Sequence, residues 1–250
     1  MNFTYIIPFK FTEDRFKTLT KVIKNARELG FPIIVVEQGS ESLLPSKELL
    51  NKEEKYIFVK NDLPFNKSWG LNCAWKEVET DGVIFGDADN LIDTEVLKKS
   101  ISEMEDYDFI SPHKRLIDLN QQESELDYQN IFDINRPGRG ELDHQKLPLC
   151  GAMTIFKKSA LEKIGGWPEE FFGWGAEDDA MSIKVNHFLK WKENEFNCYH
   201  LYHERVIPME DWYMRNFKIY QNYHQATKEQ LLSHIESTKT LIGDKNRKFQ

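Results

Sequence analysis

Two carboxylates one residue apart, Asp87 and Asp89, come directly after an apolar run at residues 83–85. Such a run predicts a short buried strand, so the pair lies where this strand ends. Hard divalent cations prefer oxygen ligands, and paired carboxylates can hold such a cation against a diphosphate. An acidic surface turn has the same composition. Asp-x-Asp by itself is common and, taken alone, favours the turn.

A second acidic cluster, Glu177, Asp178 and Asp179, follows the sequence Gly-Trp-Gly at residues 173–175. The dipole of a helix favours acids in its first turn, and this effect alone can explain the cluster. A tryptophan between two glycines indicates instead a hinged loop that places the ring of Trp174 over a ligand. One carboxylate of the cluster can then act as general base toward an acceptor hydroxyl. We favour this functional interpretation over simple capping.

His200 and His203 are three positions apart and can share one face of a turn. One of them could complete an octahedral metal site begun by the aspartate pair. A zinc site is the competing interpretation, but no nearby cysteine or third histidine supports it. Histidine pairs are more often structural, so this pair supports a metal site but does not establish one.

Further polar or charged residues follow the first three predicted strands. They are Pro8, Phe9 and Lys10, then Glu37, then Asn66, Lys67 and Asn72. The crevice at the carboxyl ends of the strands is where open α/β sheets bind ligands, so these groups can converge on one ligand. Lys10, Arg15 and Lys67 can neutralise a diphosphate, and Glu37 can face the nucleoside. Solvated turns explain each residue nearly as well. No GxGxxG or P-loop pattern occurs, which argues against dinucleotide or ATP chemistry.

The elements that position these residues alternate along the first half of the chain. Apolar runs at 3–7, 33–36, 56–59 and 83–85 predict strands. A helix is expected from Thr12, its cap, to about Leu29, with Gly30 ending it, and another over 68–78. Strands that alternate with helices imply right-handed crossovers. The predicted fold class is therefore α/β, with a mostly parallel central sheet flanked by helices.

The second half is less regular. Residues 111–140 are polar and predict loops and short strands over one face of the sheet. We expect strands at 149–156 and 195–199 and helices at 158–164 and 177–189. From about 209 to 239 the chain is polar with spaced aromatics and leucines, which predicts a helical C-terminal extension. The expected organisation is one domain over residues 1–207 followed by an extension over 208–250.

Composition narrows the class of protein. A chain of 250 residues suits one sizeable α/β domain. The net charge of −8 provides no strong basic field to collect nucleic acid. Aromatics make up 13%, which fits a large core or a sugar site, since pyranose C–H faces pack on aromatic planes. Three widely spaced cysteines and a short apolar start, with no signal peptide or transmembrane segment, lead us to expect a cytoplasmic protein.

The motifs together resemble those of glycosyltransferases. Residues 150–153, 165–168 and 171–179 resemble the catalytic region of β-1,4-galactosyltransferases. The same block is similar to parts of polypeptide N-acetylgalactosaminyltransferases and chondroitin-type polymerases. The first half resembles family-2 glycosyltransferases at residues 7–10, 65–72 and 87–89. The likeness covers residues 3–205 and is most specific over 165–180. It implies the GT-A fold, a Rossmann-like nucleotide-diphospho-sugar transferase, with a nucleotide-sugar half over 1–110 and an acceptor half over 111–207.

The resemblance also implies a donor and a metal. The donor would be a nucleotide-diphosphate sugar, with UDP as the first choice, and the group moved would be a hexose or N-acetylhexosamine. Asp87 and Asp89 would contact Mn²⁺ (or Mg²⁺) and the sugar nucleotide. His203 matches the late metal-binding histidine of the family best. His200 falls where the galactosyltransferases carry a methionine ligand.

The acceptor side follows from the same likeness. Asp178 would deprotonate the acceptor in an inverting displacement, and Glu177 would bind the acceptor or support that base. Trp174, followed by Gly175, matches the tryptophan of a mobile loop. Asp179 is followed by Ala180, where the animal enzymes carry another acid, and the anchor and disulfides of those enzymes are missing. A bacterial or viral enzyme therefore fits better than an animal one.

Three alternatives remain. The chain can be a sugar-nucleotide-binding protein without transfer activity. It can be a metal-dependent nucleotidyltransferase, against which the tryptophan-loop block argues. It can also use a modified DNA base of a phage as acceptor in place of a glycan or another hydroxyl-bearing molecule, and the acidic balance weakens this nucleic-acid alternative. The sequence gives no oligomeric state.

Overall fold

Runs of β-branched and aromatic residues form the central sheet of this computed structural model, which describes residues 1–139, 148–149, 151–204 and 210–249. The seven strands lie in the order β3-β2-β1-β4-β8-β6-β9. Only β8 runs against its neighbours, so the prediction of a mostly parallel sheet is confirmed. Their bounds are β1 (Phe3–Phe9), β2 (Ile33–Gly39), β3 (Lys55–Lys60), β4 (Gly82–Gly86), β6 (Phe109–Ser111), β8 (Met153–Lys157) and β9 (Trp191–Glu193).

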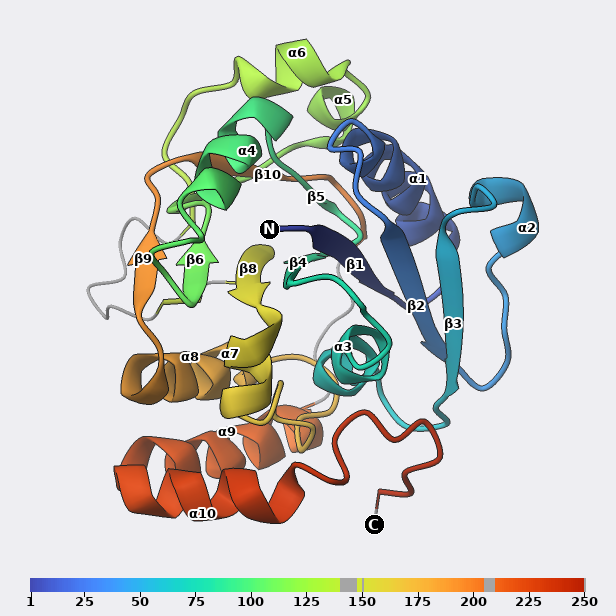
Figure 1. Cartoon of the computed structure of the whole chain (residues 1–250). Helices are drawn as coiled ribbons and strands as arrows, with labels where there is room; N and C mark the ends of the chain where they lie inside the picture. The colour runs from blue at the N-terminus through green and yellow to red at the C-terminus, as the bar shows by residue number, and fades with distance from the viewer. Residues whose placement is uncertain (140–147, 150, 205–209, 250) are drawn as a thin grey trace.

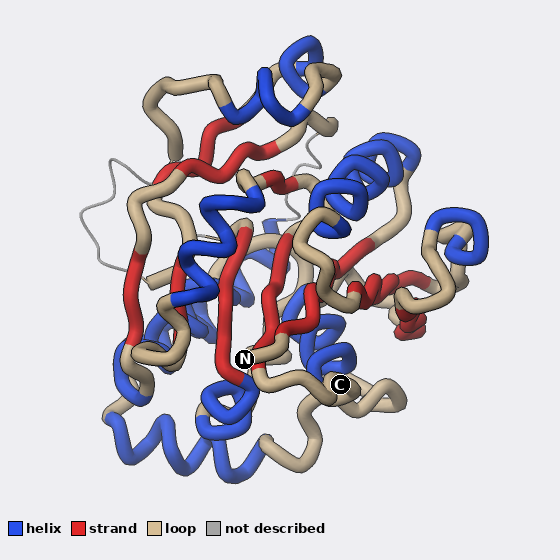
Figure 2. Tube along the Cα trace, turned by 45° about the horizontal axis from the view of Figure 1, so that its top comes forward, coloured by secondary structure: helices blue, strands red, loops and turns tan. Residues whose placement is uncertain are grey.

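Helices cover both faces of this sheet (Figures 1 and 2). Strand β1 is buried along its whole length, because its alternate side chains pack into two different cores. Tyr5 and Ile7 join the core that includes α1 (Glu13–Arg27) and α4 (Thr94–Ser102), whereas Ile6 joins the opposite one. The opposite core includes α3 (Lys67–Trp75), α7 (Lys158–Lys163) and α8 (Glu177–Phe188). The short helix α2 (Ser46–Leu49) lies between β2 and β3 in the chain.

A second, three-stranded sheet joins distant parts of the chain. Its order is β5-β10-β7, with bounds β5 (Asn90–Leu91), β7 (Arg115–Asp118) and β10 (Asn197–His200). His200 lies opposite Asn90 on one side and opposite Asp118 on the other. This register brings the late histidines to the acidic turn that follows β4.

The C-terminal extension is helical, as predicted. It contains α9 (Glu210–Gln225) and α10 (Lys228–Thr238), which lie below α7 and α8 in Figure 1. A small core joins these helices to the segment at residues 171–180; it consists of Phe171, Ala180, Tyr223 and Leu231. The tail then returns to α3, where Trp69 Nε1 donates to the carbonyl oxygen of Asp244 at 2.9 Å. The division at residue 207 stays a prediction.

The C-terminal tail also contacts a buried carboxylate, that of Glu169. The Glu169 side chain is 1% exposed and lies 2.6 Å from the guanidinium of Arg247. Asn72 and the backbone N–H of Gly243 also donate to it, at 2.9 and 2.8 Å. The extension is therefore tied to the first half of the chain by polar contacts as well as by apolar packing.

Several element predictions need correction. The predicted loops at 111–140 contain two short helices, α5 (Gln121–Ser124) and α6 (Tyr128–Phe132), each begun by a side-chain cap from Asn120 or Asp127. The strand predicted at 149–156 begins only at Met153, because Gly151 and Ala152 have φ values of 81° and 61°. Helix α4 was not predicted. Residue 150 and the predicted start of the extension at 209 lie outside the described residues.

One further observation concerns length and polarity. Within the residues that the structure describes, no helix is both long enough and apolar enough to cross a membrane.

Candidate functional site

Asp89, His200 and His203 converge at the edge of the second sheet. Asp89 directly precedes β5, and β10, which pairs with β5, ends at His200. The backbone N–H of Leu201 also donates to the carbonyl oxygen of Asp89 at 2.7 Å, which holds the two segments together. One carboxylate oxygen and one nitrogen from each imidazole all lie within 4.8 Å of one another. This spacing suits three ligands of one metal ion.

The two imidazoles are held in the way expected of metal ligands. His203 Nε2 lies 3.2 Å from Asp89 Oδ2, while its Nδ1 lies 2.9 Å from the carbonyl oxygen of Glu204. His200 Nε2 lies 4.0 Å from the same oxygen of Asp89, while its Nδ1 lies 3.0 Å from Asp118 Oδ1. With a divalent ion bound, a proton on each Nδ1 would satisfy these outer acceptors and leave both Nε2 atoms free to hold the metal together with Asp89. The donor set therefore fits a divalent transition ion with open positions for further ligands.

Asp89 remains ionised despite its burial. Burial raises the pKa of Asp89, but the hydrogen bond from His203 and the charges of His200 and Arg15 outweigh it and lower the pKa to about 2. The bond to Asp89 raises the pKa of His203, whereas burial lowers the pKa of His200. Arg15 Nη1 lies 4.0 Å from Asp89 Oδ2, so the guanidinium that was predicted to neutralise a diphosphate lies beside this carboxylate. The carboxylate is available as an anionic ligand.

Asp87 faces a different partner from the one predicted. Lys67 Nζ lies 2.9 Å from Asp87 Oδ1, and Asp87 is not part of the three-residue group among the described residues. The physical reason is that the ammonium of Lys67, at the start of α3, is largely buried and needs a counter-charge. In this structure Asp87 is therefore the partner of Lys67, and its role as a metal ligand stays a prediction.

Asp178 lies on the other side of the same ammonium. Its Oδ1 atom is 3.9 Å from Lys67 Nζ and is buried without a hydrogen-bond donor among the described residues. Burial raises the pKa of Asp178, Lys67 opposes this, and the charge of Asp87 adds to the rise. A carboxylate with an unoccupied oxygen and a raised pKa is a stronger base than an exposed aspartate.

Glu177 and Asp178 occupy the first turn of α8. The residue before this turn, Ala176, has a φ of 71° and provides no side-chain cap, so the helix dipole acts directly on these acids. Burial and the neighbouring charge of Asp178 raise the pKa of Glu177 to about 8. A small cavity here is lined by Lys67, Phe85, Asp87, Gly151, Ala152, Thr154, Trp167 and Asp178. The structure thus brings both predicted acids of α8 to the Lys67 and Asp87 pair.

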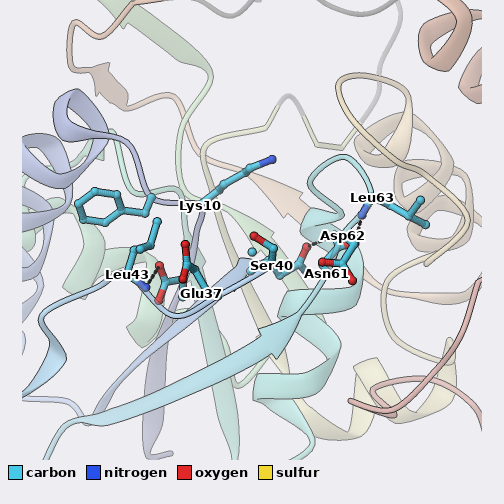
Figure 3. A pocket seen from close by; sticks show the side chains of 11 residues that line it. Lys10, Glu37, Ser40, Leu43, Asn61, Asp62 and Leu63 are labelled. Carbon is cyan, nitrogen blue, oxygen red and sulfur yellow. Dashed lines mark hydrogen bonds between the residues drawn. The ribbon is translucent and has the colours of Figure 1, made fainter.

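A larger cavity of about 230 Å³ opens at the carboxyl ends of β1, β2 and β3 (Figure 3). Glu37 lies in it, but its carboxylate accepts hydrogen bonds from the backbone N–H groups of Leu43 and Leu44 at 3.2 Å and from the hydroxyl of Tyr56. Glu37 therefore shapes the wall, which presents backbone and side-chain polar groups to the cavity. The lining residues are Lys10, Phe11, Glu37, Gln38, Gly39, Ser40, Glu41, Leu43, Asn61, Asp62 and Leu63.

Asn72, predicted to contact substrate, is completely buried. Its Nδ2 donates to the carbonyl oxygen of Trp167 at 2.8 Å and to Glu169 at 2.9 Å. Its Oδ1 accepts from Trp75 Nε1 at 2.7 Å and from the Trp167 N–H at 2.9 Å. The amide is fully used within the protein, so the predicted role is corrected: Asn72 holds α3 against the segment at 167–169.

The other predicted substrate-binding residues near the strand ends are either buried within the protein or line the larger cavity. Asn66 is buried and caps α3 by accepting from the Trp69 N–H at 2.9 Å. Pro8 and Phe9 are buried within β1, and Phe9 packs in the core. Of the residues predicted after the first strand, Lys10 alone lines the larger cavity. Substrate contact by Asn66, Pro8 and Phe9 is thus not what the geometry shows.

The tryptophan loop is exposed. Trp174 is 66% exposed, and Gly173 and Gly175 have φ values of 74° and 104°, which only glycine adopts readily. The Trp174 ring stacks on Tyr213 of α9, with centroids 5.9 Å apart and planes 20° apart. The ring is therefore exposed in the loop that precedes the acids of α8, and its predicted placement over a ligand stays a prediction.

Sequence reasoning missed Asp118 and Tyr213. Asp118 supports His200 only because β7 and β10 pair in one register, and an isolated aspartate in a polar segment gives no signal of this. Tyr213 was one of several spaced aromatics in the extension. Its helical spacing to the other aromatics was the signal available.

Comparisons with known proteins agree with this geometry. A model described as glycosyl transferase family 2 matches residues 4–165, and one described as the N-terminal domain of galactosyltransferase matches 143–204. Beta-1,4-galactosyltransferase 5 of Danio rerio is 25% identical over 126 residues, which cover 49% of this chain and 26% of that protein. The match thus spans about a quarter of that curated relative's length.

Solved structures show the same architecture. TarS 1–349 of S. aureus has a TM-score of 0.61 at 16% identity, over 98% of this chain and 71% of that one, and its complex with UDP-GlcNAc gives 0.62. The catalytic domain of Drosophila β1,4-galactosyltransferase 7 with xylobiose has a TM-score of 0.57 at 13% identity, over 91% and 82% of the two chains. A mutant of that enzyme, bound to manganese, UDP-Gal and xylobiose, gives 0.50 at 11% identity.

Proposed function

Because the chain belongs to glycosyl transferase family 2 and has the GT-A fold of its structural neighbours, we propose that it transfers a hexose or N-acetylhexosamine from a UDP-sugar to an acceptor hydroxyl. The proposed reaction is a single displacement that inverts the anomeric carbon and depends on a divalent metal. The geometry at Asp89, His200 and His203, with Asp178 at the neighbouring cavity, is the observation that carries this proposal.

The larger cavity is the proposed site for the nucleoside. It lies at the carboxyl ends of the first three strands, where open α/β sheets bind ligands. Glu37 and its bonded loop form one wall, and Lys10 provides a cation at the rim. UDP is supported by two structural neighbours that were solved with UDP-sugars.

The metal is proposed to be Mn²⁺ held by Asp89, His200 and His203. Imidazole nitrogens suit first-row transition ions, whereas Mg²⁺ prefers an all-oxygen shell, so Mn²⁺ fits better than Mg²⁺. When bound, such an ion neutralises charge that develops on the leaving diphosphate. Arg15, 4.0 Å from Asp89, is placed to assist the same neutralisation.

Asp178 is the proposed general base. Its free Oδ1 takes the acceptor proton while the acceptor oxygen attacks the anomeric carbon and the bond to the diphosphate breaks. Lys67 lies between Asp87 and Asp178, and its charge opposes the rise in the pKa of Asp178. Glu177, whose raised pKa leaves it partly protonated near neutral pH, can donate a hydrogen bond to the acceptor.

A hydrolysis screen tests the proposal. UDP-, GDP- and TDP-sugars are incubated with the protein and Mn²⁺, and release of the nucleotide is measured without acceptor. Slow release from one UDP-sugar, lost in Asp89→Asn, is expected, since water replaces the acceptor in an open site. Absence of both hydrolysis and UDP binding in the folded protein would reject the proposal. Release of pyrophosphate from a nucleoside triphosphate would point to nucleotidyl transfer instead.

A further inference from the structure

Exposed aromatic side chains gather beside the tryptophan loop. Four Trp, Tyr and Phe side chains are exposed among the described residues, and three of them are Trp174, Tyr213 and Phe217. Tyr220 and His224 continue the line, with ring centroids 6.3 Å apart from Phe217 to Tyr220 and 5.7 Å from Tyr220 to His224. Positions 213, 217, 220 and 224 follow the spacing of one helix face. These five residues are called the aromatic row.

The aromatic row is fixed relative to the loop that leads to Asp178. Tyr213 stacks on Trp174, and a Cβ added at Gly175 would lie 3.4 Å from the Tyr213 ring, so this ring lies beside the loop. Asn216, completely buried on α9, donates to the carbonyl oxygens of Phe172 and Trp174 at 2.9 and 3.4 Å. The row therefore begins at the proposed acceptor site and leads away from it along α9.

Other side chains than the exposed rings of the aromatic row provide most of the packing of α9. The packed side of the helix uses Tyr223, which joins Phe171, Ala180 and Leu231 in a separate small core. Asn216 anchors the same side by hydrogen bonds. Tyr220 is half-buried and packs against this core, whereas Trp174, Tyr213 and Phe217 are exposed. Exposed aromatic patches of this kind usually mark a binding surface.

We propose that the aromatic row is a subsite for an extended glycan chain whose end is the acceptor, an inference that rests on the proposed function. Pyranose rings present C–H faces that pack on flat aromatic rings, and the Tyr213 and Tyr220 hydroxyls can bond to sugar hydroxyls. From 213 to 224 the helix rises about 16 Å, which is longer than one sugar. The subsite therefore favours oligosaccharides over monosaccharides.

The charges on α9 argue for this occupant over an anionic membrane. The exposed charged side chains of its first half are Glu210, Asp211, Arg215 and Lys218, two of each sign. A helix that lies on anionic lipid carries an excess of Lys and Arg on its polar face. A neutral sugar polymer needs no such excess.

Native electrophoresis in gels that contain glycol chitin, hydroxyethyl cellulose or xylan tests the subsite. We expect at least one polymer to retard the parent protein, and the double variant Tyr213→Ser/Phe217→Ser to bind it about tenfold more weakly, since two ring contacts are lost. Leu232→Ser on α10 is the matched control: it removes another exposed apolar side chain and should leave retardation unchanged.

Two gel results would overturn the subsite: no retardation of the parent in any gel, or equal retardation of the parent and the double variant. A parent dimer in sedimentation that the double variant abolishes would show instead that the row binds a second copy of the chain. Flotation of the parent with phosphatidylcholine–phosphatidylglycerol vesicles, lost in the double variant, would show that it binds a membrane. Calorimetry with UDP and Mn²⁺ on the same proteins is the separate test of the proposed function. Lack of UDP binding together with lack of hydrolysis rejects that function, whereas the gel result tests the glycan subsite alone.

Discussion

His203 Nε2 lies 3.2 Å from Asp89 Oδ2, which joins the acidic turn after β4 to the segment after β10. The Nδ1 atom of His203 is bonded to a backbone carbonyl, so the two atoms that face each other are the ones that a metal ion would bridge. This contact is the basis of the proposed metal site, and it distinguishes Asp89 from Asp87, which faces Lys67.

The first prediction separates these two aspartates. Asp89→Asn should weaken Mn²⁺ binding by more than about 100-fold, because it removes the anionic ligand that both imidazoles face. Asp87→Asn should retain Mn²⁺ binding, because Asp87 pairs with Lys67. Calorimetry of both variants with Mn²⁺ and UDP measures this. The opposite ranking would return the ligand role to Asp87.

The second prediction concerns the residue that supports His200. Asp118→Ala should lower Mn²⁺ affinity about 10- to 100-fold, because His200 loses the acceptor that fixes its orientation. Arg139→Ala is the control, since it removes the other partner of Asp118 and leaves the contact with His200 in place. Equal Mn²⁺ affinity in Asp118→Ala and the parent would show that this contact does not orient the ligand.

The third prediction tests the base. Asp178→Asn should reduce kcat about 10²- to 10⁴-fold while the affinity for UDP and Mn²⁺ stays near that of the parent, because only the proton acceptor is removed. Asp179→Asn, one residue further along α8, should keep most of the activity. Steady-state kinetics with calorimetry on each variant measures both quantities. Parent-like turnover in Asp178→Asn would contradict the assignment.

The fourth prediction concerns pH. Asp178 must be ionised to accept a proton, and burial raises its pKa, so kcat/KM should fall as pH drops through a range above that of an exposed aspartate. Lys67→Gln removes the charge that opposes this rise, so the acid limb should move to higher pH. Rate profiles of the two proteins from acid to neutral pH test this. A limb that moves to lower pH would exclude Asp178 as the titrating base.

The fifth prediction concerns the C-terminal tail. Arg247→Met should lower the free energy of unfolding by about 1–3 kcal/mol at pH 8, because the buried carboxylate of Glu169 loses its cation. Burial raises the pKa of Glu169, and Arg247 is among the groups that oppose this rise. The folded state therefore favours the protonated acid, and this contribution is lost as pH rises through the folded pKa. The destabilisation by Arg247→Met should accordingly be smaller at pH 5.

Denaturant unfolding at both pH values measures this difference. Lys245→Met is the matched control in the same tail, because its ion pair with Glu77 is more exposed and should contribute less than about 1 kcal/mol. Equal losses for Arg247→Met at pH 5 and pH 8 would show that ionisation of Glu169 is not involved.

Local pattern predicted the elements that carry the first half of the site. Thr12 and Gly30 predicted the bounds of the first helix within a few residues, because caps and stops act through neighbouring backbone groups. Helix α4 was not predicted, although Asp93 caps it, because it is only nine residues long and its apolar pattern is short. The late strand begins two residues later and ends one residue later than predicted, so His200 lies in β10 and not after it.

The sequence by itself determined the α/β class, the family likeness and most residues of the site, because apolar periodicity and short motifs are local properties of the chain. Only the tertiary structure decided which of these residues meet. The pairing of β10 with β5 and β7 places the two histidines beside Asp89. Asp87 forms an ion pair with the buried ammonium of Lys67. The amide of Asn72 forms its hydrogen bonds within the protein, where α3 packs. These choices depend on strand register and on the need to satisfy buried polar groups, which no local pattern encodes.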